Sequence, residues 1–295
     1  MAFVYKKGPR NSDWNYGGQK WRLSRSKIDL FMQCPRCFYI DNKFGVARPK
    51  MPSFTLNIAV DALLKKEFDI HRAEKSAHPL MKSYSVDAVP YQHKNMDLWR
   101  DNFKGVEFRH QETHMAICGA VDDIWINPEG ELMIVDYKAT SKDGKMDSLD
   151  DTSWQAQYKR QMEVYQWLLR KNDFKVSDTG YFVYVNGRAD KAGFDGKLEF
   201  DVTLIAHTGN DKWVEKTIFK IKECLEDERI PAYTVGCDYC DYLTLLGKTL
   251  RDNTKSSVKE SAQEDISVPI KKITKKSKKK SEDESGVEVK SLFEL

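Results

Sequence analysis

Two apolar runs joined by a short turn constrain the fold of this chain more than any other feature. They flank residues 127–130, Asn-Pro-Glu-Gly, which is a turn sequence. Apolar runs joined by so few residues predict a β-hairpin. Asp122 lies on the first predicted strand, whereas Asp136 and Lys138 lie two residues apart on the second, so their side chains project from one face. The hairpin therefore brings two carboxylates and one ammonium together.

This combination suits a divalent cation bound by oxygen ligands, with a lysine beside it that orients water or stabilises developing negative charge. An Asp-x-Lys pair on an exposed strand usually has no function beyond solvated charge, because surface ion pairs contribute little to stability. Here Ile134 and Val135 precede Asp136, so we expect the strand to be buried up to that carboxylate. A buried carboxylate is costly unless it is paired or bound to metal. The sequence therefore favours a metal site.

The same residues resemble the PD-(D/E)XK nuclease superfamily and, within it, the RecB-type and CRISPR-adaptation nucleases. Residues 119–122 match its Gly-x-x-Asp element, and residues 136–138 match its Asp-x-Lys element. Gln161 and Tyr165 match a third element, Gln-x-x-x-Tyr, and share one face of a predicted helix because they are four residues apart. The resemblance implies an α/β fold with a restriction-endonuclease-like core, in which helices flank a mixed central β-sheet.

The resemblance also implies roles for these residues. Asp122 and Asp136 would hold one or two Mg²⁺ or Mn²⁺ ions, with the backbone carbonyl of Tyr137 as a further ligand. Lys138 would position or deprotonate the attacking water and stabilise the transition state. The last pair, Gln161 and Tyr165, would orient the nucleic-acid backbone.

A fourth element of the family is an upstream helix with Gly-x-x-x-His, whose histidine binds metal. In this chain Asp61 takes the place of the histidine and Asn57 that of the glycine, which departs from the family pattern. An aspartate still binds Mg²⁺ or Mn²⁺, and its hard oxygen favours Mg²⁺. The alternative is that Asp61 is an ordinary exposed residue of its helix. Its apolar neighbours favour the ligand interpretation.

Cysteine usage gives the second strong signal. Four of the six cysteines form two Cys-x-x-Cys pairs, Cys34 with Cys37 and Cys237 with Cys240. Two such pairs suit a site with four thiolate ligands for a metal. Their wide separation predicts a staple that joins the N-terminal region to the end of the folded domain. The two other cysteines, Cys118 and Cys224, we interpret as packing residues.

The segment around the first pair also resembles RecB-type nucleases, because Ser24, Ser26 and residues 34–39 follow their Ser-x-Ser and Cys-Pro-x-x-Phe-Tyr elements. The resemblance implies a [4Fe-4S] cluster. Those nucleases usually have one upstream and three downstream cysteines, whereas no further cysteine follows Cys240. A two-plus-two arrangement also suits Zn²⁺, so both metals stay open. The remaining alternative is free buried thiols in a reducing cytoplasm.

Apolar patterning divides the chain into three parts. Residues 1–22 are polar and glycine-rich and predict a flexible segment, residues 23–247 predict the nuclease domain, and residues 248–295 predict a disordered, lysine-rich tail. We predict helices over residues 24–40, 55–73, 95–105, 154–172 and 212–225, and strands over residues 106–137, 180–185 and 198–205. Strands with helices between them indicate an α/β core.

The tail carries two further signals. Its lysine run at 271–280 can contact phosphates, although a solvated tail without a partner is an equal alternative. The apolar end at 289–295 contains Ser-Leu-Phe, which resembles the end of peptides that bind bacterial sliding clamps. The tail therefore predicts a sliding clamp as a partner.

We predict a metal-dependent deoxyribonuclease, an exonuclease of DNA repair or recombination that acts on single-stranded DNA or on ends. The alternatives are a non-catalytic nucleic-acid-binding module and a metal-stapled scaffold that keep the nuclease fold. The net charge is only +3, so no global field indicates nucleic acid. No apolar run reaches membrane-spanning length and the start lacks a signal-type hydrophobic region, so we expect a cytoplasmic protein without membrane contact.

Overall fold

The computed structural model describes residues 9–49, 54–144, 146–150 and 153–260. The lysine run at 271–280 and the apolar peptide at 289–295, to which the sequence assigns phosphate contact and clamp binding, lie outside these residues. The chain divides into two compact units, residues 1–244 and 245–295. All strands among the described residues belong to the first unit.

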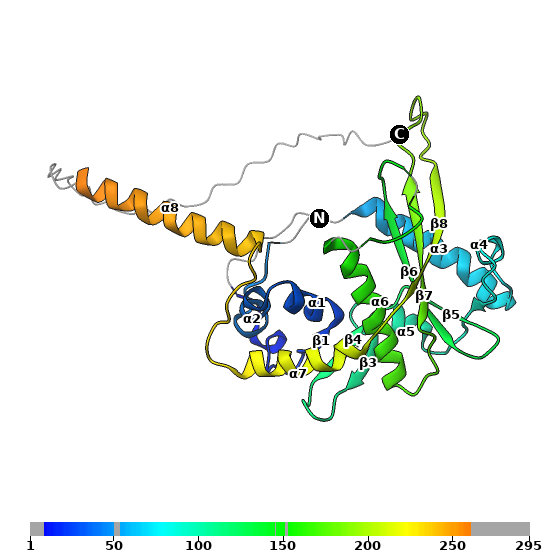
Figure 1. Ribbon diagram of the computed structural model, residues 1–295, viewed down its shortest axis with the longest axis horizontal. Helices are drawn as coiled ribbons and strands as arrows, with labels where there is room; N and C mark the ends of the chain where they lie inside the picture. Colours follow the sequence, from blue (N-terminus) through cyan, green and yellow to red (C-terminus); the bar gives the residue numbers. More distant parts are fainter. Residues whose placement is uncertain (1–8, 50–53, 145, 151–152, 261–295) are drawn as a thin grey trace, which may run out of the picture. The chain divides into compact units, whose positions relative to one another are not determined.

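A five-stranded mixed sheet forms the centre of the first unit (Figure 1). In spatial order its strands are β2 (Val89–Pro90), β5 (Asp123–Ile126), β6 (Leu132–Thr140), β7 (Thr179–Gly187) and β8 (Phe200–Thr208). Neighbouring strands are antiparallel except β6 and β7, which are parallel and are connected through helix α6 (Ser153–Lys171). The parallel pair needs this crossover because its strands run in the same direction.

The predicted hairpin is present as β5 and β6. Its turn is fixed by the side chain of Asn127, whose Oδ1 accepts a hydrogen bond of 2.7 Å from the backbone N–H of Glu131. Gly130 has φ of 77°, a left-handed conformation that glycine adopts without strain. These contacts fix the register that sets Asp123 opposite Val135. The strand begins at Asp123, so Asp122 immediately precedes it rather than lying on it.

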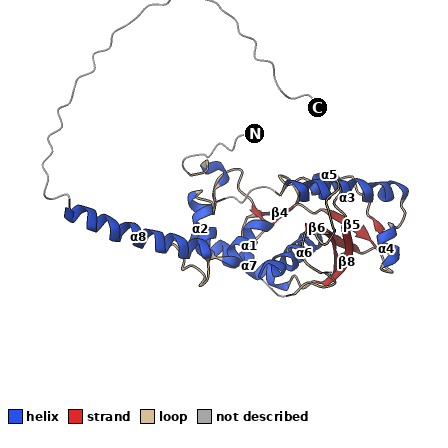
Figure 2. Cartoon of the chain, turned by 90° about the horizontal axis from the view of Figure 1, so that it is seen from above, coloured by secondary structure: helices blue, strands red, loops and turns tan. Residues whose placement is uncertain are grey.

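Side-chain alternation along β6 divides its residues between two cores. Leu132 and Ile134 belong to a core shared with α6, whereas Val135 and Tyr137 pack with Phe68 of α3 (Thr55–Glu74). Figure 2 shows α3 and α6 on opposite sides of the strands. The structure thus confirms the predicted α/β fold, a mixed central sheet flanked by helices. Asp136 and Lys138 continue the row that faces α6.

A second, smaller sheet lies beside α6. Its order is β1 (Leu23–Ser24), β4 (Ala116–Gly119) and β3 (Val106–Arg109), with β1 parallel and β3 antiparallel to β4. The remaining elements of this part are short: the 3-10 helix η1 (Ser12–Trp14) and the α-helices α4 (Pro79–Ser83) and α5 (Met96–Arg100). The last of these is shorter than the helix predicted over residues 95–105.

The sequence predicts one helix over residues 24–40, and this prediction is wrong. The structure has two helices, α1 (Arg25–Gln33) and α2 (Pro35–Phe44), separated by Cys34 in an extended conformation. The cause is Pro35, because a proline disfavours the helical conformation of the residue before it and is itself favoured at the first position of a helix.

Of the segment predicted to be flexible, residues 1–22, residues 1–8 lie outside the described part, and specific contacts hold residues 10–22. Arg10 forms an ion pair of 3.0 Å with Asp41 of α2, and the indole N–H of Trp21 donates a hydrogen bond of 2.9 Å to Asn42. Tyr16 and Trp21 also pack against the core that β6 shares with α6, which we call the main core. These two aromatic side chains attach the segment to the core, although its overall composition is polar.

Two helices complete the described chain. The predicted helix over residues 212–225 is present as α7 (Lys212–Glu226), which buries Ile218 and Ile221 against the main core. The last helix, α8 (Asp238–Glu260), extends beyond residue 248, where the sequence predicts the disordered tail to begin. Within the described part of the chain, no helix combines the length and the hydropathy that crossing a lipid bilayer requires.

Candidate active site

Strand β6 presents the acidic residue and the lysine predicted for catalysis. The side chain of Asp136 is completely buried, and that of Lys138 is 16% exposed. The ammonium of Lys138 forms an ion pair with Oδ2 of Asp136 and lies 4.6 Å from the ring centroid of Tyr158. The prediction that Asp136 and Lys138 share one face of the strand is therefore confirmed.

Helix α6 supplies the next two predicted residues. The amide nitrogen of Gln161 donates hydrogen bonds to Oδ1 of Asp136, at 2.7 Å, and to the hydroxyl of Tyr165, at 3.1 Å. Lys138 donates a longer hydrogen bond of 3.4 Å to the carbonyl oxygen of Gln161. Four of the predicted site residues thus form one connected network. Gln161 holds the carboxylate of Asp136 in place, a contact that the sequence did not predict.

Asp122 reaches this network from the residue before β5. Its Oδ2 accepts a hydrogen bond of 3.0 Å from the backbone N–H of Tyr137, which lies between Asp136 and Lys138. The side chain of Asp122 is 25% exposed, whereas that of Asp136 is completely buried. This contact brings the carboxylate next to the backbone of β6.

Asp61 approaches from α3, but a lysine stands beside it. Lys65, one helical turn further on, forms ion pairs of 2.8 Å with Asp61 and 3.5 Å with Asp122. Asn57, in the glycine position of the family element, donates a hydrogen bond of 2.7 Å to the backbone oxygen of Ala139 in β6. The start of α3 is thus tied to the end of the strand that bears the site.

The three carboxylates do not form a tight cluster by themselves. Among the described residues, two groups of at least three His, Cys, Asp or Glu side chains have ligand atoms within 4.8 Å of one another, and neither contains Asp61, Asp122 or Asp136. One group is the four paired cysteines. The other includes His110 and Glu215, joined by a hydrogen bond of 2.8 Å.

The electrostatics of the site favour an added cation. Burial raises the pKa of Asp136 to about 7, although the Lys138 ammonium acts in the opposite direction. Burial also raises the pKa of Asp61, against the hydrogen bond from Lys65. Oδ2 of Asp136 is buried, and the ammonium of Lys138 is paired with it. Burial of this carboxylate remains costly despite the single ammonium, and a bound cation would offset that cost.

Two positively charged residues at this site escaped the sequence analysis. Lys65 gave one signal, its position four residues after Asp61 on a predicted helix. Arg25, the first residue of α1, lies beside Tyr165. Burial lowers the pKa of Arg25, but its neighbours Tyr165, Asp29 and Asp136 raise it to a greater extent. Arg25 lies a long way from the other site residues in the sequence, so no spacing could have indicated it.

The carboxylate of Asp123, the residue after Asp122, is paired with side chains of the protein itself. It is completely buried and forms ion pairs with Arg72 and, at 3.1 Å, with Arg100. The hydroxyl of Tyr137 donates a further hydrogen bond of 2.7 Å to it. Two guanidinium groups and a hydroxyl therefore stabilise this carboxylate without a metal. Asp122 and Asp123 are adjacent residues of the same type. They differ in that their side chains project to opposite sides of the sheet.

Gly119, the glycine of the Gly-x-x-Asp element, gives room to Tyr165. A Cβ at this position would lie 2.6 Å from Cε1 of Tyr165, closer than non-bonded atoms tolerate. The glycine thus lets α6 approach the end of β4 and sets the position of the Tyr165 hydroxyl next to Gln161.

We expect Gly119→Ala to lower the free energy of unfolding by about 1–3 kcal/mol, the usual cost of overpacking a core. Because Tyr165 has to move, the cleavage rate should fall as well. Urea unfolding and the assay described below measure the two effects. Gly193→Ala is the matched control, since a Cβ there meets no atom within 4 Å among the described residues. Equal stability of the two variants would contradict the role assigned to Gly119.

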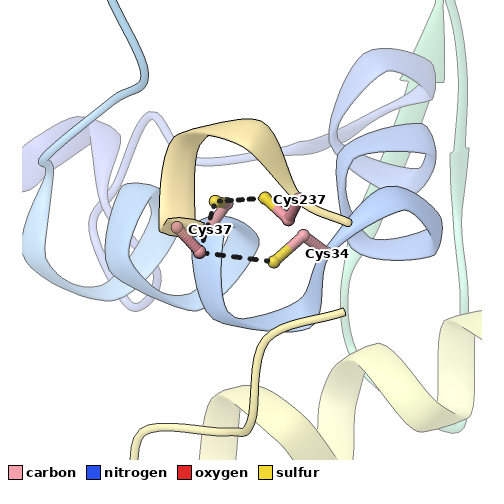
Figure 3. A group of neighbouring side chains, drawn as sticks. Cys34, Cys37 and Cys237 are labelled. Atoms are coloured by element: carbon pink, nitrogen blue, oxygen red, sulfur yellow. Dashed lines mark hydrogen bonds between the residues drawn. The ribbon is translucent and has the colours of Figure 1, made fainter. Parts of the chain in front are cut away.

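The four paired cysteines converge, as the sequence predicts for a staple. Cys34 and Cys37 lie at the start of α2, and Cys237 and Cys240 lie at the start of α8 (Figure 3). All four are free thiols and all are buried. The other two cysteines are free as well, with Cys118 buried in β4 and Cys224 half-buried in α7.

Comparison with known proteins gives a match to a family model. Residues 59–245 match the family model of the PD-(D/E)XK nuclease superfamily. No curated protein matches the chain. A solved structure described as the crystal structure of SSO0001 has 12% sequence identity and a TM-score of 0.33, with 71% of this chain and 79% of that chain covered. The family match includes Asp61 and every later site residue, but the first cysteine pair lies outside it.

Proposed function

This chain belongs to the PD-(D/E)XK nuclease superfamily, and from that premise we propose that it hydrolyses phosphodiester bonds of DNA with a divalent cation held by Asp122 and Asp136. The observation that carries the proposal is the buried carboxylate of Asp136, which is fixed by Gln161 on one oxygen and faces Lys138 with the other. We propose Mg²⁺ or Mn²⁺ as the cation, because both prefer carboxylate oxygen ligands.

The residues present fit such a cation. Asp136 offers a buried carboxylate oxygen that faces the Lys138 ammonium, and Asp122 offers a partly exposed carboxylate. Asp61 and the backbone carbonyl of Tyr137 are the further ligands that we propose. Lys65 now lies between Asp61 and Asp122, where its positive charge offsets both carboxylates. Binding through Asp61 therefore requires the Lys65 ammonium to move aside.

The protein side chains divide the chemistry between them. A bound divalent cation lowers the pKa of water and offsets the charge on the phosphate. The Lys138 ammonium is placed to orient the attacking water and to stabilise negative charge in the transition state. Gln161 keeps Asp136 in its productive rotamer, and Tyr165 keeps Gln161 in place. Arg25 adds a positive charge beside Tyr165, where a phosphate of the backbone can be bound.

The cellular role is part of the same proposal. We propose an exonuclease of DNA repair or recombination that acts on single-stranded DNA or on ends, because no base-reading motif is present and phosphate contacts alone do not specify sequence. The six free thiols support a reducing compartment such as the cytoplasm. A sliding clamp that binds residues 289–295 remains a proposal made from the sequence alone.

A cleavage assay tests the activity directly. The full-length protein is incubated with linear single-stranded, linear double-stranded and circular single-stranded DNA, each with Mg²⁺, Mn²⁺ or EDTA. We expect cleavage of the linear single-stranded DNA with either cation and none with EDTA. Mononucleotides or short products from linear but not circular DNA indicate an exonuclease. No cleavage of any substrate with either cation would contradict the proposal and favour a non-catalytic nucleic-acid-binding module.

A further inference from the structure

The paired cysteines form a separate centre that the nuclease chemistry does not use. Each Cys-x-x-Cys pair begins a helix: Cys34 is the residue before α2, and Cys237 is the residue before α8. The partial positive charge at a helix N-terminus stabilises negative groups there, so two helix starts face one cluster of sulfur atoms. Figure 3 shows the thiols turned toward one another.

The distances between the sulfur atoms are short and similar. Sγ of Cys37 lies 3.5 Å from that of Cys240 and 3.7 Å from that of Cys237, and Sγ of Cys34 lies 3.8 Å from that of Cys240. All four sulfur atoms lie within 4.8 Å of one another. These separations exclude disulfides, in which the sulfur atoms are about 2.05 Å apart.

The spacing discriminates between the two kinds of thiolate centre. Zn²⁺ binds sulfur at about 2.3 Å in a tetrahedron, which requires neighbouring sulfur atoms about 3.8 Å apart. In a [4Fe-4S] cluster each thiolate binds a different iron atom, so the cysteine sulfurs lie outside the whole cluster and much farther apart than sulfurs that share one ion. The observed separations therefore fit a single tetrahedral ion and leave no room for a cubane between the sulfur atoms.

We propose that Cys34, Cys37, Cys237 and Cys240 bind one structural Zn²⁺ ion, in place of the [4Fe-4S] cluster that the resemblance to RecB-type nucleases implies. The inference rests on the thiol geometry and is independent of the proposed nuclease function. All four ligands come from the protein, so the ion has no open position for substrate, which is the arrangement of structural zinc sites.

The surroundings of the centre suit four thiolates around a dication, which carry a net negative charge. Arg48 donates a hydrogen bond of 3.5 Å to Sγ of Cys237, and its guanidinium lies 4.5 Å from the ring centroid of Tyr239. A second hydrogen bond, of 2.9 Å, joins Arg48 to Gln33. The arginine is thus held against the sulfur atoms from two sides, and its positive charge offsets theirs.

The ion would join α2 to the start of α8, segments about two hundred residues apart in the sequence. Apolar contact around the thiols is limited to three half-buried side chains among the described residues, those of Leu30, Tyr233 and Tyr239. A centre with so little packing of its own depends on its metal, because the binding free energy becomes folding free energy. Removal of the ion should release the second cysteine pair from α2.

Metal analysis of the wild-type protein tests the assignment. The protein is purified anaerobically from cells grown with added iron, and its zinc, iron and acid-labile sulfide are measured. We expect one zinc per chain, neither iron nor sulfide, and no broad visible absorption. Replacement of the zinc by Co²⁺ should produce the intense visible bands of tetrahedral cobalt thiolate. Four irons and four sulfides per chain would overturn the proposal, and so would a metal-free protein with all thiols reactive.

Variants locate the ion. Cys237→Ser should lose most of the zinc, whereas Cys224→Ser, which changes a half-buried cysteine of α7, should retain it. Should Cys237→Ser fail to fold, the wild-type protein still decides the matter: a mercurial that titrates its thiols should release zinc into a chromogenic chelator in proportion to four of the six cysteines. Zinc retained in full by a folded Cys237→Ser protein would contradict the site. Loss of nuclease activity alone would not bear on it.

Discussion

Cleavage of linear DNA is expected to be lost in the Asp136→Asn variant, with a rate reduced by on the order of 10³-fold or more, as is usual when a group that stabilises transition-state charge is removed. Asparagine has nearly the same shape as aspartate, and it still offers an oxygen to the amide of Gln161. The substitution thus removes the charge with little change in side-chain volume, while the Lys138 ammonium loses its ion-pair partner. The lost activity would reflect the missing negative ligand for the cation and not a disturbed fold.

Asp201→Asn is the matched control for this experiment. Asp201 is an exposed carboxylate on β8 of the same sheet, so its replacement removes one negative charge from the protein without touching the site. We expect the control to cleave at the wild-type rate and both variants to have unchanged circular dichroism. Cleavage by the folded Asp136→Asn protein at the rate of the control would refute the assignment of the site.

The same substitution should stabilise the metal-free protein at high pH, an effect that runs opposite to its effect on activity. The pKa of Asp136 is about 7 in the folded chain, raised mainly by burial, against a usual value of 3.8. Folding therefore favours the protonated carboxyl, and this contribution to stability is complete below about pH 4. It is lost as pH rises toward 7, by at most about 1.4 kcal/mol per pH unit.

Urea unfolding in EDTA between pH 4 and pH 8 measures this contribution. The stability of Asp136→Asn relative to the wild type should rise across that range and level off above pH 7, where it should amount to a few kcal/mol. Addition of Mn²⁺ at pH 8 should raise the free energy of unfolding of the wild-type protein and have little effect on that of the variant. Parallel pH profiles for the two proteins would show that Asp136 is not a buried carboxylate with a raised pKa.

The hairpin and the shared face of Asp136 and Lys138 could be predicted from the sequence because both depend on local patterns. Two apolar runs around an Asn-Pro-Glu-Gly turn specify β5 and β6, and the two-residue spacing of Asp136 and Lys138 places them on one face. The four-residue spacing of Gln161 and Tyr165 likewise places both side chains on one face of α6. Periodicity within one element was sufficient in both cases.

The remaining features depend on contacts between elements that sequence spacing does not contain. Lys65 is part of the site because α3 crosses the end of β6, and Arg25 because α1 begins beside Tyr165. The different partners of Asp122 and Asp123 come from tertiary packing, which supplies two arginines to Asp123. The distances between the cysteine sulfurs likewise exist only after α2 and α8 have been brought together.

The limits of two helices differ between the sequence-based prediction and the structure. The break at Cys34 was predictable from Pro35, because a proline disfavours the helical conformation of the residue before it. Helix α8 extends to Glu260 through a region whose composition resembles a disordered tail. Lysine and leucine are good helix formers, so a charged segment with fading apolar periodicity can still be helical.

The most direct test of the account is a crystal structure of the full-length protein soaked with Mn²⁺, with the anomalous signal of manganese used to locate the ion. The account predicts a peak between the carboxylates of Asp122 and Asp136, within about 2.0–2.6 Å of an oxygen of each, with Lys138 beside it and Lys65 displaced from Asp61. A peak at another place, or none at concentrations of Mn²⁺ that support cleavage, would contradict the claim that these aspartates hold the catalytic cation.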